Sequence, residues 1–440
     1  MGINLSEMKE KLIAITIGGK SNEEVDPAYK AAVFKEYIEK ALPGANIRSV
    51  EPISTAASLN SVCAYVDIAA RDGKYLPAFV KIHIESDTQS TSVLGAENEY
   101  SQANLLARYG WPVLVPLMSS GSREYPLLVY PRIEEKTLFD LFKDSYDKGK
   151  NLIALSDLDI FSQLNKQVGE AMVNNSKLID SKEAVRSPVQ TLFLERFRKG
   201  SRIDTWYRHG TRFGLPGEDE YITWQELLES KWVINGDPYN ITLAEVVENA
   251  RRYLSFDQEP KALVCISHGD DHSGNIFMDR EGGEAIIFDP AFAGWNPASL
   301  SNVKALAHSC ILPMGGMYYD PKIGNVSYNW ERNRNIIHVD IPFENSVLNH
   351  VHEALAKQII DLRILPLFQR SKQTGIDVKN EHERIKYALA GCALLTTNIL
   401  RLLEQDDGRG QSLLPLTIML AELKGLPMLS YLREQITQEL

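Results

Sequence analysis

The 440-residue sequence predicts an α+β protein with a small antiparallel-sheet lobe followed by a larger, mostly helical lobe. Two observations carry this prediction. Short runs rich in Val, Ile, Tyr and Phe occupy residues 46–132, where Asp72 and Gly73 supply a hairpin turn. Apolar residues at helical spacing then dominate residues 133–440.

Composition narrows the class of protein. Apolar residues make up 44% of the chain and charged residues 24%, which is typical of a soluble globular protein and excludes a disordered tail. The formal net charge of −11 disfavours nucleic acid and anionic membranes as partners. Four scattered cysteines without CxxC spacing indicate a reducing compartment. We therefore expect a cytoplasmic monomer or homodimer.

The N-terminal part divides into a helical extension, residues 1–45, and the small lobe, residues 46–132. In the extension, the pattern DPAYKAAVFKEYIEKAL predicts a helix that stops at a Pro-Gly pair. The small lobe should hold a five-stranded sheet and one inserted helix. The strands are expected at residues 46–54, 61–71, 75–86, 113–119 and 125–133, and the helix at 93–109.

The large lobe, residues 133–440, is expected to be mostly helical, with a break at residues 262–294. There, apolar strands surround the string HGDDHSGN and a Glu-Gly-Gly-Glu turn. Asp270 lies five residues before Asn275, and Asp289 lies fourteen residues after it, where a strand ends. Two carboxylates and an amide oxygen at one rim suit Mg²⁺, which prefers oxygen ligands.

The string HGDDHSGNIF, followed by IIFDPAFAG, resembles the aminoglycoside phosphotransferase/choline kinase family, whose loop reads HGDxHxGN. All six fixed positions of that loop are matched without gaps. The resemblance implies a two-lobed protein-kinase-like fold, and it covers residues 46–294 in element order. It also implies ATP and Mg²⁺ as cofactors. The catalytic segment would be residues 267–290.

The resemblance assigns roles to three of these residues. Asp270 would be the base that orients the acceptor hydroxyl, and Asn275 and Asp289 would hold magnesium against the ATP phosphates. Lys81, on the third strand, resembles the family lysine that contacts the α- and β-phosphates. Such a lysine needs an acidic partner from the following helix, for which Glu99 is favoured over Glu97.

The remaining nucleotide contacts are expected at the phosphate loop and at the connection between the lobes. The phosphate loop, residues 54–60, contains no glycine, which departs from the family and restricts left-handed backbone conformations. Ser58 and Asn60 could offer donors to the phosphates. At the connection, the backbone of Tyr130 and Ile133 would meet the adenine edge, and Pro131 can only accept a hydrogen bond.

The function that follows is phosphoryl transfer from ATP to a hydroxyl of a small polar molecule, such as an amino sugar, sugar, aminoglycoside or amino alcohol. Two alternatives stay open. A protein kinase is disfavoured because no activation-loop signature follows Asp289. A nucleotide-binding pseudokinase that serves as an interaction module is favoured only by the glycine-free phosphate loop. The acceptor itself, and ATP over GTP, cannot be read from the sequence.

Overall fold

The computed structural model divides into two compact units, which are described separately. One unit comprises residues 1–108, 113–135 and 288–291, and the other comprises 109–112, 136–287 and 292–440. Within these, the structure describes residues 26–53, 61–69, 74–83, 96–121, 125–214, 221–239, 241–313, 327–340, 348–396, 413–424 and 427–439. The expected phosphate-loop residues Ser58 and Asn60 lie outside the described residues.

The first unit is an antiparallel sheet with two helices. Its strands follow the order β1-β2-β3-β5-β4. The elements are α2 (Pro27–Ala41), β1 (Ile47–Ile53), β2 (Ser61–Ala69), β3 (Tyr75–His83), α3 (Ala96–Arg108), β4 (Met118–Ser119) and β5 (Leu127–Pro131). The α+β class and the small antiparallel sheet near the N-terminus are therefore confirmed.

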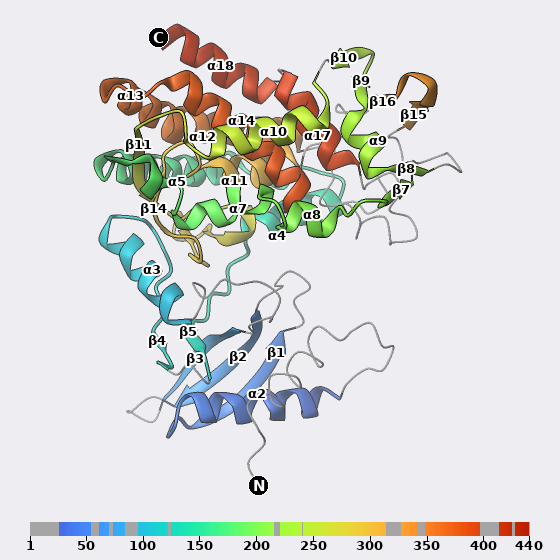
Figure 1. The fold of residues 1–440 in the computed structure, drawn as a ribbon. Coiled ribbons are helices and arrows are strands. Elements are labelled where there is room, and N and C mark those ends of the chain that lie inside the picture. Colours follow the sequence, from blue (N-terminus) through green and yellow to red (C-terminus); the bar gives the residue numbers. More distant parts are fainter. Residues whose placement is uncertain are drawn as a thin grey trace. The chain divides into compact units, whose positions relative to one another are not determined.

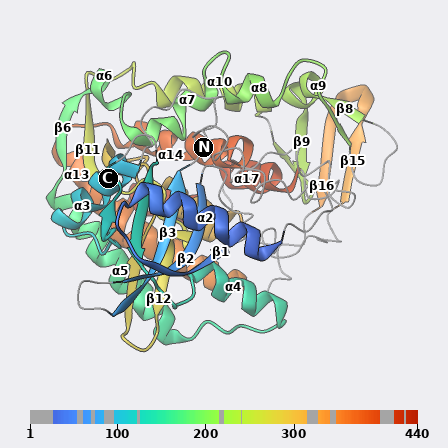
Figure 2. The ribbon, with the colours of Figure 1, turned by 90° about the horizontal axis from the view of Figure 1, so that it is seen from below.

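Helix α2 covers the sheet, as Figures 1 and 2 show. Its start is specified locally, because the Asp26 side chain accepts a hydrogen bond from the Ala28 amide and Pro27 opens the first turn. Phe34, Tyr37 and Ile38 are fully buried and pack against inward-facing residues of β2 and β3 such as Ala64 and Val80. This apolar layer makes the helix part of the sheet's core.

The expected strand at residues 113–119 is wrong over most of its length, since only Met118 and Ser119 pair with β5. Pro112 and Pro116 interrupt this segment, and proline has no N–H to donate to a sheet. The valine and leucine residues of the run are half-buried or exposed and not part of a paired strand, so the apolar pattern alone was a poor guide here.

The second unit is mostly helical (Figure 1). Its helices are α4 (Leu138–Asp147), α5 (Leu155–Asn174), α6 (Ser181–Ala184), α7 (Leu194–Phe197), α8 (Arg202–Trp206), α9 (Trp224–Glu229), α10 (Leu243–Leu254), α11 (Val303–Leu306), α12 (Asn349–Ile359), α13 (Leu365–Gln373), α14 (Val378–Leu395), α17 (Leu414–Lys424) and α18 (Pro427–Glu439). Helices α4, α9 and α10 each begin with a complete Thr-x-x-acid capping box.

Small sheets accompany these helices. Their strands are β6 (Lys177–Asp180), β7 (Arg212–Gly214), β8 (Tyr221–Thr223), β9 (Lys231–Ile234), β10 (Asp237–Tyr239), β11 (Lys261–Ser267), β12 (Ile276–Asp279), β13 (Glu284–Ile287), β14 (Gly294–Pro297), β15 (Ser327–Glu331) and β16 (Ile336–Asp340). The sequence did not predict β6 to β10 or β14 to β16, so the expectation of a lobe that is helical outside one strand-rich segment was incomplete. Two of these are short strands whose partners are distant in sequence: β6 pairs with β11 and β9 with β16. Local patterns do not reveal such pairing.

Candidate active site

The loop that carries HGDDHSGN leaves β11 through a glycine that no other residue could easily replace. Gly269 has φ +80°, in the left-handed region that glycine tolerates. A Cβ at this position would lie 3.1 Å from the carbonyl oxygen of Phe292 and 3.3 Å from the side chain of Val189. The turn therefore sends the chain sharply from the buried strand to Asp270.

Two side chains fix the backbone of Asp270. The Asp270 amide donates to Nδ1 of the fully buried His268 at 3.2 Å, and the ring of Trp111 stacks on that histidine. Asn275 donates its side-chain NH₂ to the Asp270 carbonyl at 2.8 Å. Because the amide nitrogen of Asn275 is used in this way, its amide oxygen is oriented as an acceptor for a cation.

The next carboxylate, Asp271, anchors the loop from beneath. It forms a buried ion pair with Arg363, and neither side chain is exposed. Arg363 lies in a π-helical turn, Ile360–Ile364, which precedes Pro366. Helix α5 packs against this turn through Gly169, where a Cβ would lie 1.9 Å from the Leu362 carbonyl oxygen. A buried carboxylate without its cation would be costly, so the pair fixes the loop's position.

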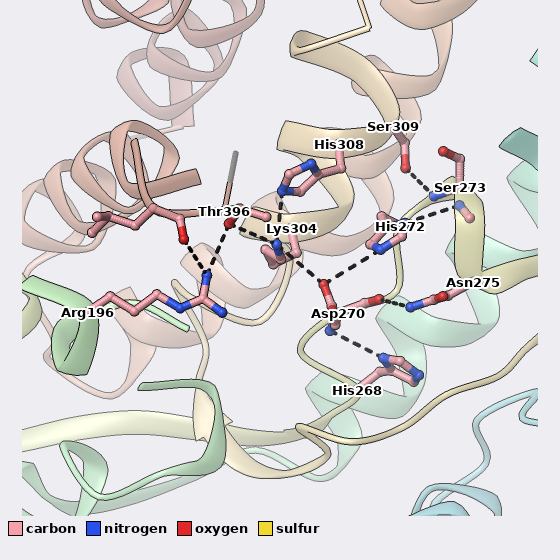
Figure 3. A network of polar contacts seen from close by, with 12 residues as sticks. Arg196, His268, Asp270, His272, Ser273, Asn275, Lys304, His308, Ser309 and Thr396 are labelled. Atoms are coloured by element: carbon pink, nitrogen blue, oxygen red, sulfur yellow. Dashed lines mark hydrogen bonds and ion pairs between the residues drawn. The ribbon is translucent and has the colours of Figure 1, made fainter. Parts of the chain in front are cut away.

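The Asp270 side chain faces a cation that the sequence did not reveal. Lys304 of α11 places its ammonium 3.6 Å from Oδ1 of Asp270, and its side chain is 5% exposed. The ammonium also donates to Nε2 of His308 at 2.9 Å and to Oγ1 of Thr396 at 3.2 Å. Figure 3 shows Lys304 between Asp270 and Thr396. The Asp270 side chain itself stays 20% exposed.

Two histidines near Asp270 are held neutral. Burial lowers the pKa of His272, and Lys304 lowers it further, although Asp270 opposes the shift. Its Nδ1 accepts from the Gly274 amide at 3.1 Å, which leaves Nε2 3.9 Å from Asp270 (Figure 3). Burial and the charge of Lys304 hold the pKa of His308 well below its ordinary value. Asp270 thus faces one lysine and one uncharged imidazole, that of His272, and the uncharged His308 contacts the lysine.

The first unit holds a second cluster, around Lys81 on β3. The Lys81 ammonium lies 2.9 Å from Glu99 Oε2, on α3, and 2.5 Å from Asp289 Oδ1. The Tyr130 hydroxyl on β5 donates to the other oxygen of Glu99 at 2.5 Å. Glu99 is buried, whereas the Asp289 side chain is 38% exposed. A lysine, two carboxylates and a phenol therefore share one site.

Two carboxylates keep the Lys81 ammonium charged. Burial disfavours the Lys81 ammonium, but Asp289 and Glu99 outweigh it and raise the Lys81 pKa. Burial, with the charge of Glu99, holds the pKa of Tyr130 well above its ordinary value, so this phenol remains a donor. On the neighbouring strand, Cys63 pairs with Lys81 in register, and burial raises its thiol pKa to about 12. Cys63 is therefore an inert apolar residue.

The backbone at Asp289 is unusual. Its φ of +60° lies in the left-handed region, which Asp and Asn adopt more readily than other non-glycine residues. The Asp289 carbonyl accepts from the Ala291 amide at 2.9 Å, and Gln102 of α3 donates to the Ala291 carbonyl at 3.3 Å. This tight turn after β13 delivers the carboxylate to Lys81.

The structure thus groups the expected residues into two sets. Lys81, Glu99 and Asp289 meet in the first unit, and Asp270 and Asn275 meet in the second. Tyr130 contributes its hydroxyl to the first set, a contact that the sequence interpretation did not include. Ile133 follows β5 and is half-buried. The side chain of Glu97 lies outside the described residues.

Sequence reasoning missed three residues around the loop: Asp271, Lys304 and Arg363. Asp271 occupies a variable position of the loop pattern HGDxHxGN, and the pattern assigns a function only to its neighbour Asp270. Lys304 and Arg363 lie in helical segments whose patterns resemble ordinary core helices. A usable signal existed for Lys304, since a lysine inside the apolar run VKALAHSCIL must be paired if that run is buried.

Each unit offers, by itself, one donor of the kind that fits magnesium. Asp289 offers a partly exposed carboxylate of which Lys81 contacts Oδ1, and Asn275 offers an amide oxygen. Hard oxygen donors of this sort, one or two per site, are what Mg²⁺ uses when phosphates complete its shell. Within the described ranges, no group of three or more His, Cys, Asp or Glu side chains is arranged to hold a metal ion.

Comparisons with known proteins give structural similarity only. No family model matches the sequence, and no curated protein matches it. Among solved structures, a macrolide 2'-phosphotransferase type I is 14% identical with a TM-score of 0.41, covering 91% of this chain and 98% of that one. An ethanolamine kinase from Plasmodium vivax is 10% identical with a TM-score of 0.48, covering 98% and 96%. Such values assign neither activity nor substrate.

Two further features concern the described helices and the four cysteines. None of the helices in the described part of the chain is long and apolar enough to cross a bilayer. All four cysteines are buried and unpaired, as the scattered spacing indicates.

Proposed function

We propose that the protein is a kinase that transfers the γ-phosphoryl group of ATP to a hydroxyl of a small polar molecule. The observation that carries this proposal is the pairing of Lys81 with both Glu99 and Asp289, residues that lie 18 and 208 positions away in the sequence. A lysine fixed by a helix glutamate, beside a candidate metal carboxylate, is what phosphate binding requires.

Each residue has a distinct task in this proposal. Lys81 binds the α- and β-phosphates, and Glu99 with Tyr130 holds its ammonium in place. Asp289 and Asn275 supply oxygen ligands for Mg²⁺, which would neutralise charge on the phosphates. The Tyr130 and Ile133 backbone contacts adenine, and Ser58 and Asn60 remain proposed phosphate donors.

Asp270 is proposed to orient the acceptor hydroxyl and accept its proton. Its backbone is held by His268 and Asn275, and its side chain is partly exposed, so a substrate can reach it. A base positioned in this way contributes about 10²- to 10⁴-fold to the rate.

ATP consumption measured with a panel of amino sugars, sugars, amino alcohols, hydroxy acids and peptides tests the proposal. We expect turnover with at least one small hydroxyl compound and none with peptides. Turnover with peptides alone would favour a protein kinase, and nucleotide binding without turnover would favour a pseudokinase.

Two variants test the assigned roles. Asp270→Ala should lower turnover by about 10²- to 10⁴-fold and leave nucleotide affinity nearly unchanged. Asp289→Ala should instead weaken binding of Mg·ATP, measured by titration calorimetry. Wild-type turnover in Asp270→Ala would remove the base from the proposal, and unchanged affinity in Asp289→Ala would remove the metal ligand.

A further inference from the structure

Positive charge accumulates beside Asp270, and among the described residues no second carboxylate forms an ion pair with these cations. Lys304 contacts Asp270, Arg196 shares the Thr396 hydroxyl with Lys304, and Arg202 shares the Leu395 carbonyl with Arg196 (Figure 3 shows Lys304 and Arg196). Three cations are therefore linked to one another, and one of them contacts the Asp270 carboxylate. This imbalance is not needed to orient a hydroxyl, so it calls for a separate explanation.

The two arginines bond to uncharged groups. Arg196 donates to the Leu395 carbonyl and to Oγ1 of Thr396, each at 3.2 Å, and Arg202 donates to the same carbonyl at 2.8 Å. Thr396 also accepts from Lys304, so one hydroxyl links Arg196 to the lysine. The C-terminal end of α14 thus holds the cations together, but it supplies dipoles rather than a full negative charge.

The other ionisable groups that the structure describes near the cluster do not cancel its charge. Asp271 is committed to Arg363, and His272 and His308 are neutral because burial lowers the pKa of each. Burial and Arg202 lower the pKa of Arg196 to about 9, which still leaves it charged at neutral pH. Partly buried cations held together without an anion are unfavourable, and an anionic ligand relieves that cost.

We propose that the acceptor carries a carboxylate or phosphate group, which Arg196 and Lys304 bind while its hydroxyl lies at Asp270. This inference rests on the proposed kinase function and names the acceptor's chemical class. A guanidinium can bind a carboxylate or phosphate through two parallel hydrogen bonds, and Lys304 adds a point charge. A cationic amine at the same place would be repelled.

The distances also limit the acceptor's size. Lys304 lies 3.6 Å from Asp270, and Thr396 bridges Lys304 to Arg196 through two contacts of 3.2 Å. The anionic group and the reacting hydroxyl must therefore be separated by only a few bonds. Compact hydroxy acids and phosphorylated alcohols meet this condition, whereas large neutral or polycationic glycosides do not.

Binding of inorganic phosphate to the intact protein tests the site without requiring turnover. By calorimetry, the Kd for phosphate should rise at least ten-fold in Arg196→Leu and in Lys304→Met. Arg198→Leu is the matched control, because Arg198 lies two residues away and its guanidinium pairs with Glu195 at the surface. This control should change the Kd less than two-fold. The charge-conserving Arg196→Lys should keep the Kd within about three-fold of wild type, which separates lost charge from misfolding.

Phosphate could instead bind at the proposed nucleotide site. The variant Lys81→Met distinguishes binding there from binding at Arg196 and Lys304. If Lys81→Met abolishes phosphate binding and the Arg196 and Lys304 variants do not, the inference is overturned. A wild-type protein that binds no phosphate overturns it as well.

A second arm compares small acceptors that differ mainly in charge: glycerate, glycerol and ethanolamine. We expect the highest ATP consumption with glycerate and the lowest with ethanolamine. Preference for ethanolamine would overturn the inference while supporting the kinase proposal. If no acceptor is consumed, the kinase proposal is weakened, and the phosphate experiment alone decides whether the anion site exists.

Discussion

The Lys81 cluster and the Asp270 cluster have opposite charge balances. In the first, one ammonium faces two carboxylates, Glu99 and Asp289. In the second, one carboxylate, Asp270, faces Lys304 and, through Thr396, Arg196. The two aspartates are both partly exposed, but their surroundings prepare them for different partners.

This difference matches the proposed chemistry. A site with surplus negative charge attracts a cation, so Asp289 is suited to a metal ion. A site with surplus positive charge attracts an anion, so the surroundings of Asp270 are suited to an anionic acceptor and to phosphoryl oxygens. Neither property follows from the aspartate alone, since both depend on which charged side chains the neighbouring elements place beside it.

The two clusters also differ in how they are supported. Lys81 and Tyr130 lie on adjacent strands of one sheet, so strand register places them. Asp270 lies on a loop, which depends on the buried pair of Asp271 with Arg363 and on the π-helical turn against Gly169. We therefore expect substitutions in the buried pair of Asp271 and Arg363 to lower the free energy of unfolding more than substitutions beside Lys81.

The largest expected effect is on the buried pair beneath the loop. Asp271→Ala leaves the Arg363 guanidinium buried without its anion, which should lower the free energy of unfolding by about 3–5 kcal/mol. Urea unfolding measures this change. Asp289→Ala is the matched comparison, because its carboxylate is 38% exposed and should cost much less stability. Equal losses in the two variants would contradict the difference in support.

A second, smaller effect concerns pH. His352 is fully buried, contacts Phe142 edge-on and donates through Nδ1 to the Ser309 carbonyl at 2.9 Å. Burial lowers its pKa from 6.5 to about 4, so the unfolded chain binds its proton first as the pH falls. The stabilisation is complete above pH 6.5 and is lost between pH 6.5 and 4, amounting to at most about 3 kcal/mol.

The pH effect should be confined to the unit that contains Asp270. Ser309 also accepts from the Ser273 amide at 2.7 Å, which connects His352 to the loop. Hydrogen exchange at pH 7.5 and pH 5 should show loss of protection there before the sheet of β1 to β5. His352→Gln should remove the part of this pH dependence that His352 contributes and leave the part that comes from His272 and His308, whose pKa values burial also lowers. The exposed His350→Gln should leave the pH dependence unchanged. Equal loss of protection in both units would contradict the assignment to His352.

The sequence predicted the parts of the site that are encoded locally. Asp270, Asn275 and Asp289 could be found from the sequence because they lie in one short stretch of the chain, formed by one loop and one hairpin. Lys81 and Glu99 were also accessible, since strand and helix patterns are short-range signals.

The sequence could not predict contacts between residues that lie far apart in the chain. Lys304 and Arg196 reach the Asp270 network only because α11 and the end of α14 pack beside the loop. Arg363 depends on a π-helical turn that has no simple sequence signature, although Pro366 and Gly169 in retrospect mark where it forms. Strand β6 becomes visible only through its partner β11. Charge balance is a property of this assembled set, so the proposal of an anionic acceptor depends on the structure and not on the sequence pattern.

The smallest expected effect concerns the Lys81 cluster and its affinity for Mg·ATP. Glu99→Gln keeps the size of the side chain and an oxygen for the Tyr130 hydroxyl, but it removes one of the two charges that face Lys81. The ammonium keeps Asp289 as its partner, at 2.5 Å, and is then drawn away from the position that Glu99 helps define. We expect Mg·ATP affinity to fall about ten-fold, or about 1.4 kcal/mol, by calorimetry.

Glu36→Gln is the control for this variant, because Glu36 pairs with Lys40 on the exposed face of α2 at 2.9 Å and should leave nucleotide affinity unchanged. The variant also separates the two clusters, since phosphate binding at Arg196 and Lys304 should not respond to Glu99→Gln. If Glu99→Gln binds Mg·ATP as tightly as the wild type, then Asp289 alone positions Lys81. The surplus negative charge of this cluster would then have no part in nucleotide binding.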